Sequence, residues 1–244
     1  MIQVEHVTKR YGKTLANDDI VMAVQPGQLS VLLGPNGAGK STLIKCICGL
    51  LRFTGSITVN GHDNRSLEAK RTLGYVPEMP AMYNMLTVEE HLQFIARAYR
   101  LQGWEAWGEA LLQRFELDDK RKKLGQELSK GMQQKVSICC ALLPRPTAVI
   151  FDEPFVGLDP HAIRQLKELM GQMKAGGASL VISTHLIESM EQSWDATHIM
   201  EKGRIIHTRA RAEEGEGESL EALYFRITEG AAGDAAAQAG EDGP

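Results

Sequence analysis

The sequence predicts an α/β fold built on a parallel sheet, and three observations lead to that prediction. Apolar β-type segments alternate with amphipathic helical segments, which is the pattern of strands joined by crossover helices. A glycine-rich turn lies between one such strand and the helix that follows it. The middle of the chain differs, because residues 87–143 contain no convincing strand and predict an all-helical insert.

The elements of the α/β part follow from short runs of β-branched and aliphatic residues. Strands are expected at 28–34, 55–61, 73–77, 147–154 and 179–185, and helices at 41–51 and 161–173. Within 161–173, apolar residues recur every three or four positions, so one face of that helix is expected to pack on the sheet.

Three helices are expected in the insert. The first begins after Thr87, where Glu90 three residues later completes a capping box, and its apolar stripe runs to residue 99. The second covers residues 105–115. The third opens at Ser129 with the step Ser-Lys-Gly, which has no apolar surface to bury, although apolar residues follow at helical spacing.

Composition and charge exclude several classes of function. The 244 residues are 43% hydrophobic, which suits a globular protein, and the formal net charge is −4. Residues 211–244 hold nine acidic residues and two arginines, so the rest of the chain is close to neutral and presents no broad basic face for nucleic acid. The tail at 229–244 is rich in Ala, Gly and acidic residues and is expected to be disordered, while 219–227 has the spacing of a short docking helix.

The sequence also argues against secretion, membrane insertion and a cysteine framework. The first residues lack the apolar segment of a signal peptide, and the longest nearly apolar run is far shorter than the roughly 20 residues of a membrane span. The four cysteines, Cys46, Cys48, Cys139 and Cys140, lack Cys-x-x-Cys spacing and lie in apolar runs. They are expected to be small buried hydrophobic residues, with a redox or metal role as the less favoured alternative.

The segment LLGPNGAGKST contains the complete phosphate-loop pattern, with a strand before it and a helix after it. Glycines let successive backbone N–H groups surround an anion, and the helix beginning near Lys40 adds its positive end. Lys40 is predicted to contact the β- and γ-phosphates, and the Ser41 hydroxyl to bind Mg²⁺. The predicted nucleotide-binding loop comprises Gly34, Pro35, Asn36, Gly37, Ala38, Gly39, Lys40, Ser41 and Thr42.

Two further strand ends carry polar side chains that suit the same site. Asp152 and Glu153 end the strand in AVIFDEP, where the carboxyl edge of a parallel sheet adjoins the phosphate loop. Asp152 is predicted to hold Mg²⁺, directly or through water, and Glu153 to activate the attacking water. His185 ends the next strand, SLVISTH, at the same edge; the alternative for it is a hydrogen-bonded surface residue.

These motifs, in this order, resemble the nucleotide-binding subunit of an ATP-binding cassette (ABC) transporter over residues 1–228. GPNGAGKST is similar to the phosphate loop, ELSKGMQQK to the signature sequence, VIFDEP to the Mg²⁺ strand, GLDP to the D-loop and STH to the switch histidine. The resemblance implies a phosphate-loop NTPase core at 1–79 and 144–228 with an N-terminal antiparallel β region. It also implies a helical subdomain at 80–143, and the acidic tail at 229–244 lies beyond the resemblance.

The resemblance also implies roles for individual residues. Tyr11 would stack on adenine, His185 would contact the γ-phosphate, and Asp159 would shape the interface of a dimer. The signature residues Ser129, Lys130, Gly131 and Met132 would act in trans, on the ATP held by Lys40 of the opposite subunit. Lys130 could face either that nucleotide or solvent.

Two positions depart from the pattern of the family. Glu78 replaces the usual glutamine in the loop between core and helical subdomain; its carboxylate can bind Mg²⁺ or water but cannot donate as an amide does. Met132 replaces the glutamine that usually ends the signature. Both departures resemble a branch whose members export drugs, peptides or polymers through separately encoded membrane subunits.

The resulting expectation is an ATPase that uses ATP and Mg²⁺ to drive an ABC transporter, as an exporter. Its partners would be a second nucleotide-binding subunit and membrane-spanning permease subunits, with no nucleic acid, at the cytoplasmic face of the cell membrane. A cleft near Glu78, lined by Met79, Met82, Tyr83 and Met85, is the expected docking surface, unless these side chains are buried inside the helical subdomain. The alternatives are a soluble ABC ATPase acting on ribosomes or DNA, and a regulatory cassette with little hydrolysis.

Overall fold

A six-stranded sheet forms the centre of the molecule, in the order β10-β9-β3-β8-β7-β6. The computed structural model describes residues 1–185, 194–211 and 219–227. The strands of this sheet are β3 (Leu29–Leu33), β6 (Leu73–Val76), β7 (Ala148–Asp152), β8 (Ser179–Ser183), β9 (Ala196–Glu201) and β10 (Arg204–Ala210). All neighbouring pairs are parallel except β10 with β9, so the predicted parallel sheet is confirmed and gains an antiparallel edge strand.

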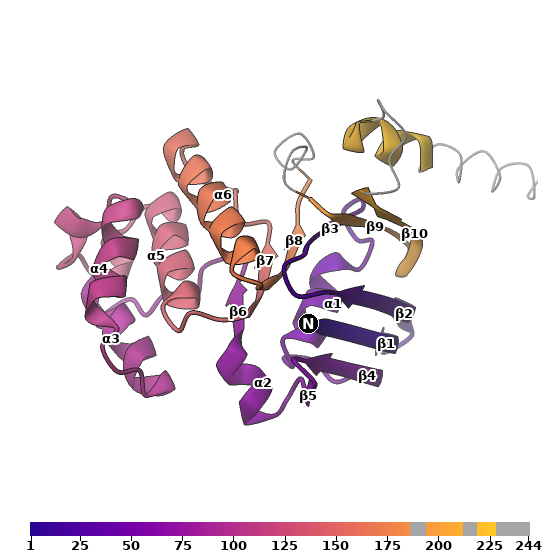
Figure 1. Ribbon diagram of the computed structural model, residues 1–244, viewed down its shortest axis with the longest axis horizontal. Coiled ribbons are helices and arrows are strands. Elements are labelled where there is room, and N and C mark those ends of the chain that lie inside the picture. The colour runs from indigo at the N-terminus through magenta and orange to yellow at the C-terminus, as the bar shows by residue number, and fades with distance from the viewer. Residues whose placement is uncertain (186–193, 212–218, 228–244) are drawn as a thin grey trace, which may run out of the picture.

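A second, antiparallel sheet lies beside the first, in the order β2-β1-β4-β5. Its strands are β1 (Ile2–Tyr11), β2 (Thr14–Val24), β4 (Thr54–Val59) and β5 (His62–Asp63). This is the N-terminal antiparallel region implied by the resemblance. Figure 1 shows it at the opposite end of the molecule from the helical insert, with the parallel strands between them.

Two apolar cores cover the two faces of the parallel sheet. Alternate residues of β3 divide between them: Val31 and Leu33 belong to one cluster and Leu32 to the other. The first cluster lies under α6 (Pro160–Ala175) and the helical insert, and the second under α1 (Lys40–Ile47) and the antiparallel sheet. The sheet edge that carries the phosphate loop is therefore held from both sides.

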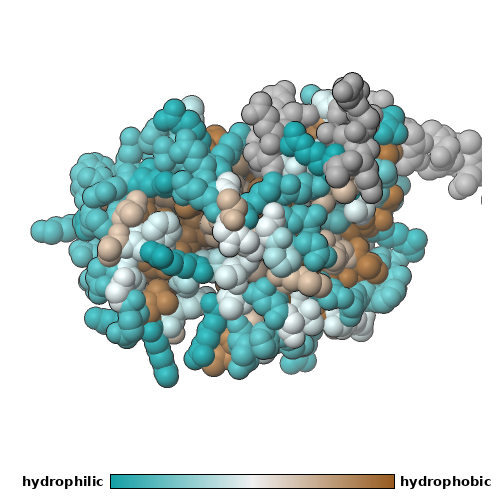
Figure 2. Space-filling model, viewed as in Figure 1, coloured by the Kyte–Doolittle hydropathy of each residue, from teal (hydrophilic) through white to brown (hydrophobic). Residues whose placement is uncertain are grey.

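The insert is helical, as the sequence predicts. It contains α3 (Val88–Tyr99), α4 (Glu105–Arg114) and α5 (Lys130–Leu142), with short 3₁₀ turns at Asp118–Lys120 and Gly125–Glu127. Both bonds of the predicted capping box are present at the start of α3, where Glu90 N donates to Thr87 Oγ1 and Thr87 N donates to Glu90 Oε2. The face of the molecule seen in Figure 2, which is the face shown in Figure 1, is largely hydrophilic, with smaller hydrophobic areas over the insert and the sheets. The exact domain boundaries remain a prediction.

Two short helices complete the described structure, one of them not predicted from the sequence. A short helix, α2 (Leu67–Thr72), connects β5 to β6. Residues 220–227 form the expected helix, anchored by the fully buried side chains of Leu220 and Leu223. The expected disordered tail at 229–244 lies outside the described residues. Within the described part of the chain, no helix has the length and apolar character needed to span a membrane.

The four cysteines are free thiols, three of them buried and Cys140 half-buried. Burial raises the pKa of Cys46 to about 11 and that of Cys140 to about 12. Because the thiolate is the reactive and metal-binding form, these side chains act as small apolar core residues.

Candidate functional site

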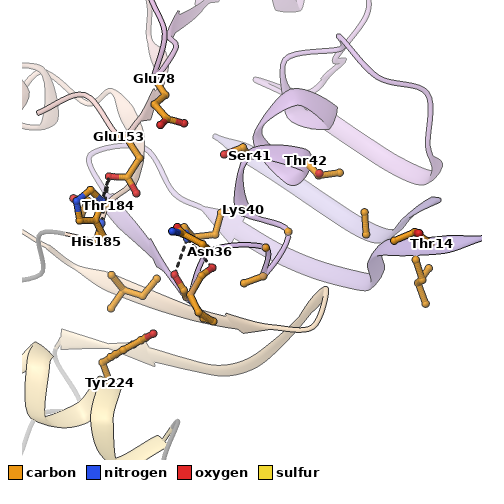
Figure 3. Close-up of a pocket in the computed structure, with 18 residues that line it drawn as sticks. Thr14, Asn36, Lys40, Ser41, Thr42, Glu78, Glu153, Thr184, His185 and Tyr224 are labelled. Atoms are coloured by element: carbon orange, nitrogen blue, oxygen red, sulfur yellow. Dashed lines mark hydrogen bonds and ion pairs between the residues drawn. The ribbon is translucent and has the colours of Figure 1, made fainter. Parts of the chain in front are cut away.

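A pocket of about 630 Å³ opens at the carboxyl edge of the parallel sheet. The loop between β3 and α1 forms its floor, and strand ends and a C-terminal helix form its walls (Figure 3). Its lining comprises Thr14, Leu15, Ala16, Leu33, all nine residues 34–42, Glu78, Glu153, Thr184, His185 and Tyr224. The complete predicted phosphate loop therefore borders one cavity.

The loop adopts its shape because glycine occupies its tightest positions. Gly39 has φ of 105°, and a Cβ there would lie 2.5 Å from the Ala16 carbonyl oxygen and 2.6 Å from Asn17 Nδ2. No residue with a side chain fits this position. Because α1 begins directly after Gly39, at Lys40, the first N–H groups of the helix face the pocket and favour an anion.

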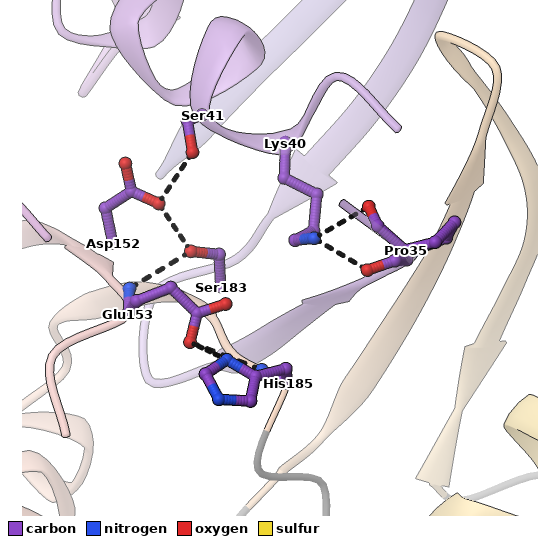
Figure 4. Close-up of polar contacts among 8 residues, drawn as sticks. Pro35, Lys40, Ser41, Asp152, Glu153, Ser183 and His185 are labelled. Carbon is purple, nitrogen blue, oxygen red and sulfur yellow. Dashed lines mark hydrogen bonds and ion pairs between the residues drawn. The ribbon is translucent and has the colours of Figure 1, made fainter. Parts of the chain in front are cut away.

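Lys40 is held inside the loop by backbone carbonyls. Its Nζ donates to Gly34 O at 2.6 Å and to Pro35 O at 3.2 Å (Figure 4). Burial lowers the pKa of Lys40, and the nearby carboxylates of Glu153, Asp152 and Glu78 oppose that shift. The ammonium group is thus preorganised beside the loop. No carboxylate of the described residues is bonded to it, so it can turn to a phosphate without breaking an ion pair.

Asp152 lies at the end of β7, behind the pocket wall, and its side chain is buried. Its Oδ1 accepts hydrogen bonds from Ser183 Oγ at 2.6 Å and from Ser41 Oγ at 3.3 Å (Figure 4). The carboxylate and the Ser41 hydroxyl therefore lie together at the start of α1. This oxygen pair is the type of ligand set that Mg²⁺ prefers.

Glu153, the next residue, points into the pocket and contacts His185. Its Oε2 lies 2.8 Å from His185 Nδ1 and accepts a longer bond from the His185 backbone N–H, at 3.3 Å. Glu153 has φ of 48°, which is uncommon for a residue with a side chain and requires support from its surroundings. Bonds from its N–H to the carbonyl and hydroxyl oxygens of Ser183 provide that support.

This geometry suits a phosphoryl-transfer site. A carboxylate aimed into a phosphate-binding pocket can accept a proton from water, and the histidine beside it can fix its orientation. His185 is bonded to Glu153 and lines the pocket, so the structure brings together the two predicted catalytic residues. Glu78 borders the same cavity on an exposed loop.

Tyr11 occupies a different place. It ends β1 with an exposed ring that lies 4.8 Å from Lys9 Nζ, and it is not among the described residues that line the pocket. The wall nearest to that strand is formed by residues 14–16. The adenine role of Tyr11 stays a prediction.

The signature residues and Asp159 also lie away from this pocket. Ser129 is the N-cap of α5, and its Oγ accepts a bond from Met132 N at 3.3 Å. Gly131 is packed against the segment after Glu153: a Cβ there would lie 2.4 Å from Gly157 O. Asp159 caps α6 by accepting from Ala162 N at 2.8 Å.

Several residues of the site were not predicted from the sequence. Ser183 bonds both Asp152 and the Glu153 backbone, and its sequence signal was a hydroxyl two residues before His185, at the end of a buried strand. Thr184, the middle residue of STH, lines the pocket, as do residues 14–16, which carry no motif. Tyr224 reaches the pocket from helix 220–227 (Figure 3), although its spacing indicated only a packing role.

Known proteins resemble this chain in sequence and in fold. A sequence profile described as ABC transporter matches residues 17–156. EcsA of Bacillus subtilis (strain 168), an ABC-type transporter ATP-binding protein, is 37% identical, with 96% of this chain and 98% of EcsA covered. The linearmycin resistance ATP-binding protein LnrL of the same strain is 35% identical, over 84% of this chain and 68% of LnrL.

A solved structure of an ATP-binding subunit of an ABC transporter superposes with a TM-score of 0.88 at 37% identity, covering 93% of this chain and 99% of that one. Its likeness extends over both sheets and the helical insert, since nearly the whole of each chain is matched. The chain therefore belongs to the ABC transporter family, as one of its ATP-binding subunits.

Proposed function

We propose that two copies of this chain together complete two ATP-hydrolysing sites, and that their closure drives export through separately encoded membrane subunits. Membership of the family makes the chain an ATPase coupled to transport, with permease partners. The observation that carries the proposal is the grouping of Lys40, Ser41, Asp152 and Glu153 at one pocket, while Ser129 lies elsewhere on the same chain.

ATP binding uses groups that are already oriented. The backbone N–H groups of residues 37–41 surround the β- and γ-phosphates, and Lys40 exchanges the carbonyls of Gly34 and Pro35 for phosphate oxygens. Glu153 then accepts a proton from the water that attacks the γ-phosphorus, while His185 holds the carboxylate in place. Placement of charge and water contributes most of the rate enhancement.

A magnesium ion fits beside Asp152, at the end of β7, and Ser41, in the first turn of α1. Ser41 Oγ and Asp152 Oδ1 lie 3.3 Å apart, and the ion would share its other positions between water and phosphate oxygens. In the described ranges, no cluster of three or more His, Cys, Asp or Glu side chains is suited to hold a metal. Bound Mg²⁺ neutralises developing charge on the phosphates.

The position of α5 supports the proposed second copy. The exposed Ser129 and the N–H groups of the first turn of α5 form an anion-binding end, yet they do not border the chain's own pocket. Because this end lies away from the chain's own pocket, we assign it to the γ-phosphate held by another subunit. The family resemblance assigns it to the ATP of the opposite subunit, which makes an ATP-dependent dimer part of the proposal.

Replacing Ser129 by arginine tests this arrangement. The bulky cation would block closure, so we expect turnover to fall at least about tenfold while ATP affinity at the chain's own loop changes little. Steady-state ATPase rates and calorimetric titration measure the two quantities. Ser66→Arg is the matched control, because Ser66 caps α2 through an equivalent bond to Ala69 N at 3.1 Å. Normal turnover in Ser129→Arg would contradict a site completed in trans.

An exposed apolar surface suits the membrane partner. Met79 is 76% exposed, Met85 71% and Tyr83 55%, while Met82 packs against the core, so the burial alternative is wrong for three of these four residues. Phe94 of α3 adjoins them, in ring contact with Tyr83 at 5.2 Å between centroids. We name Met79, Tyr83, Met85 and Phe94 the apolar docking surface. This surface begins at Met79, directly after Glu78, and Glu78 lines the nucleotide pocket.

Charging this surface should release the membrane subunits. We expect Met79→Glu combined with Met85→Glu to reduce co-purification from detergent extract at least about tenfold, because a carboxylate opposed to an apolar partner must be desolvated. Leu50→Glu, at a residue 61% exposed outside this surface, is the matched control. Thermal unfolding checks that both variants fold. Unchanged co-purification of the double variant would remove this surface from the docking interface.

Export is the direction of transport that we favour, with this chain at the cytoplasmic face of the membrane. The relative LnrL is named for linearmycin resistance, and the substitutions at Glu78 and Met132 point to the same branch. Neither relative described above is named for a ribosome or DNA, so the soluble alternative finds no support. Deleting the gene and measuring accumulation of candidate compounds in cells tests the direction: an exporter predicts higher internal levels, and lower levels would indicate import.

A further inference from the structure

Two adjacent polar residues of α5 are buried, although neither lines the nucleotide pocket. Gln134 is 1% exposed and Lys135 is 7% exposed. Side chains of these types are seldom buried unless a specific partner compensates them. Each of the two has such a partner, and the partners lie on two different loops beside the pocket.

Gln134 holds the loop that carries Glu78. Its Nε2 donates to Pro77 O at 3.2 Å, and Pro77 directly precedes Glu78. Its Oε1 is buried and has no partner within the described part of the chain. Because an apolar side chain would fill the same space without an unpaired oxygen, the amide is better explained by positioning the loop than by stabilising the core.

Lys135 holds the segment that follows Glu153. Its Nζ lies 2.7 Å from Asp159 Oδ2 and 3.9 Å from Glu116 Oε2. The hydrogen bond from Lys135, with a further bond from Ala162 N–H, keeps the pKa of Asp159 below its ordinary value. Only the Lys135 side of this ion pair is buried, so the pair adds little net stability, and its effect is to fix the position of the segment relative to α5.

A third contact lies one turn nearer to the start of α5. The close approach of Gly131 to the Gly157 carbonyl leaves no space for a side chain, and Gly157 belongs to the same segment as Asp159. The first turns of α5 are thus attached to both loops that flank the chain's own pocket. Ser129 caps the N-terminus of the same helix.

We infer that Gln134 and Lys135 are positioning residues that transmit the state of one nucleotide pocket to the Ser129 end of α5, which serves the other pocket. A helix transmits displacement over one or two turns with little bending, so movement of Glu78 or of the segment 154–159 on ATP binding reorients Ser129. This inference rests on the proposed function, because it requires that Ser129 act in trans.

The test separates ATP binding from turnover. Lys135→Met keeps the aliphatic stem and removes the charge; we expect its Kd for Mg²⁺-ATP to stay within about twofold and kcat to fall about tenfold or more. Lys135→Arg can still reach Asp159 and should recover at least about half of kcat. Gln134→Met, which removes the amide from a side chain of similar length, should lower kcat in the same way.

The control is an ion pair at the opposite end of α6. Lys174→Met removes the pair with Asp195, and we expect wild-type kcat from it. If Lys174→Met lowers kcat as much as Lys135→Met does, the effect is loss of general stability and the inference fails. A kcat for Lys135→Met within about twofold of wild type would also overturn it.

A second variant guards against a folding defect. Asp159→Asn keeps an N-cap for α6 and loses the charge, and Asp159 is half-exposed, so this variant is expected to fold. Its effect on kcat should not add to that of Lys135→Met, because both remove one interaction; additive effects would overturn the inference. Failure of the trans site itself is recognised separately, from normal turnover in Ser129→Arg.

Discussion

Replacing Lys40 by alanine is expected to abolish ATP binding at ordinary nucleotide concentrations. The loop loses its cation, while Glu153, Asp152 and Glu78 remain nearby and repel the triphosphate. Truncating one member of a buried, charge-assisted pair costs about 2–5 kcal/mol. That corresponds to a rise in Kd of roughly thirtyfold to several thousandfold, measurable by calorimetric titration with Mg²⁺-ATP.

Lys45→Ala provides the matched control for that substitution. Lys45 lies on the same helix, is exposed and is not part of the described pocket lining. ATP affinity should be unchanged in this variant. An unaltered Kd in Lys40→Ala would mean that the ammonium group does not contact phosphate, and the placement of the triphosphate on the loop between β3 and α1 would be wrong.

Replacing Glu153 by glutamine is expected to separate binding from hydrolysis. The amide keeps the size of the side chain but cannot accept a proton from water, so kcat should fall about 10²- to 10⁴-fold. The Kd for ATP should change little, because Glu153 is bonded to His185 and not to the loop. Single-turnover measurement of phosphate release gives the rate of the chemical step directly.

Glu68→Gln controls for the loss of one carboxylate, since Glu68 lies in the exposed first turn of α2. Its turnover should equal that of the wild type. If Glu153→Gln also turns over at the wild-type rate, another group activates the water, and the pairing of Glu153 with His185 would then have only a structural role.

The sequence was most informative where short-range patterns determine structure. Four of the parallel strands, β3, β6, β7 and β8, were visible because buried strands are runs of aliphatic residues. Helix α3 was visible because Thr87 and Glu90 form a capping box. β9 and β10 were missed, since their apolar positions are interrupted by polar residues such as His198 and Thr208, which bond each other across the two strands. That contact is not evident from either strand alone.

The residues of the site likewise fall into two groups, those predictable from short sequence motifs and those brought in by tertiary packing. Residues of the phosphate loop and the pair of acids after β7 were predictable because their chemistry depends on residues adjacent in sequence. Ser183 and Tyr224 reach the site through tertiary packing, from a strand and a helix far away in the chain. Lys135 ends the signature segment ELSKGMQQK, yet only its burial and its bond to Asp159 reveal a role.

The mass of Glu153→Gln in solution, measured by light scattering with and without Mg²⁺-ATP, tests the central claim most directly. We expect the mass of one chain without nucleotide and the mass of two chains with bound ATP. When Ser129→Arg is added to the same variant, the mass with ATP should again be that of one chain. A single-chain mass for Glu153→Gln with saturating ATP, or an ATP-dependent dimer that persists with Ser129→Arg, would contradict a site shared between two copies.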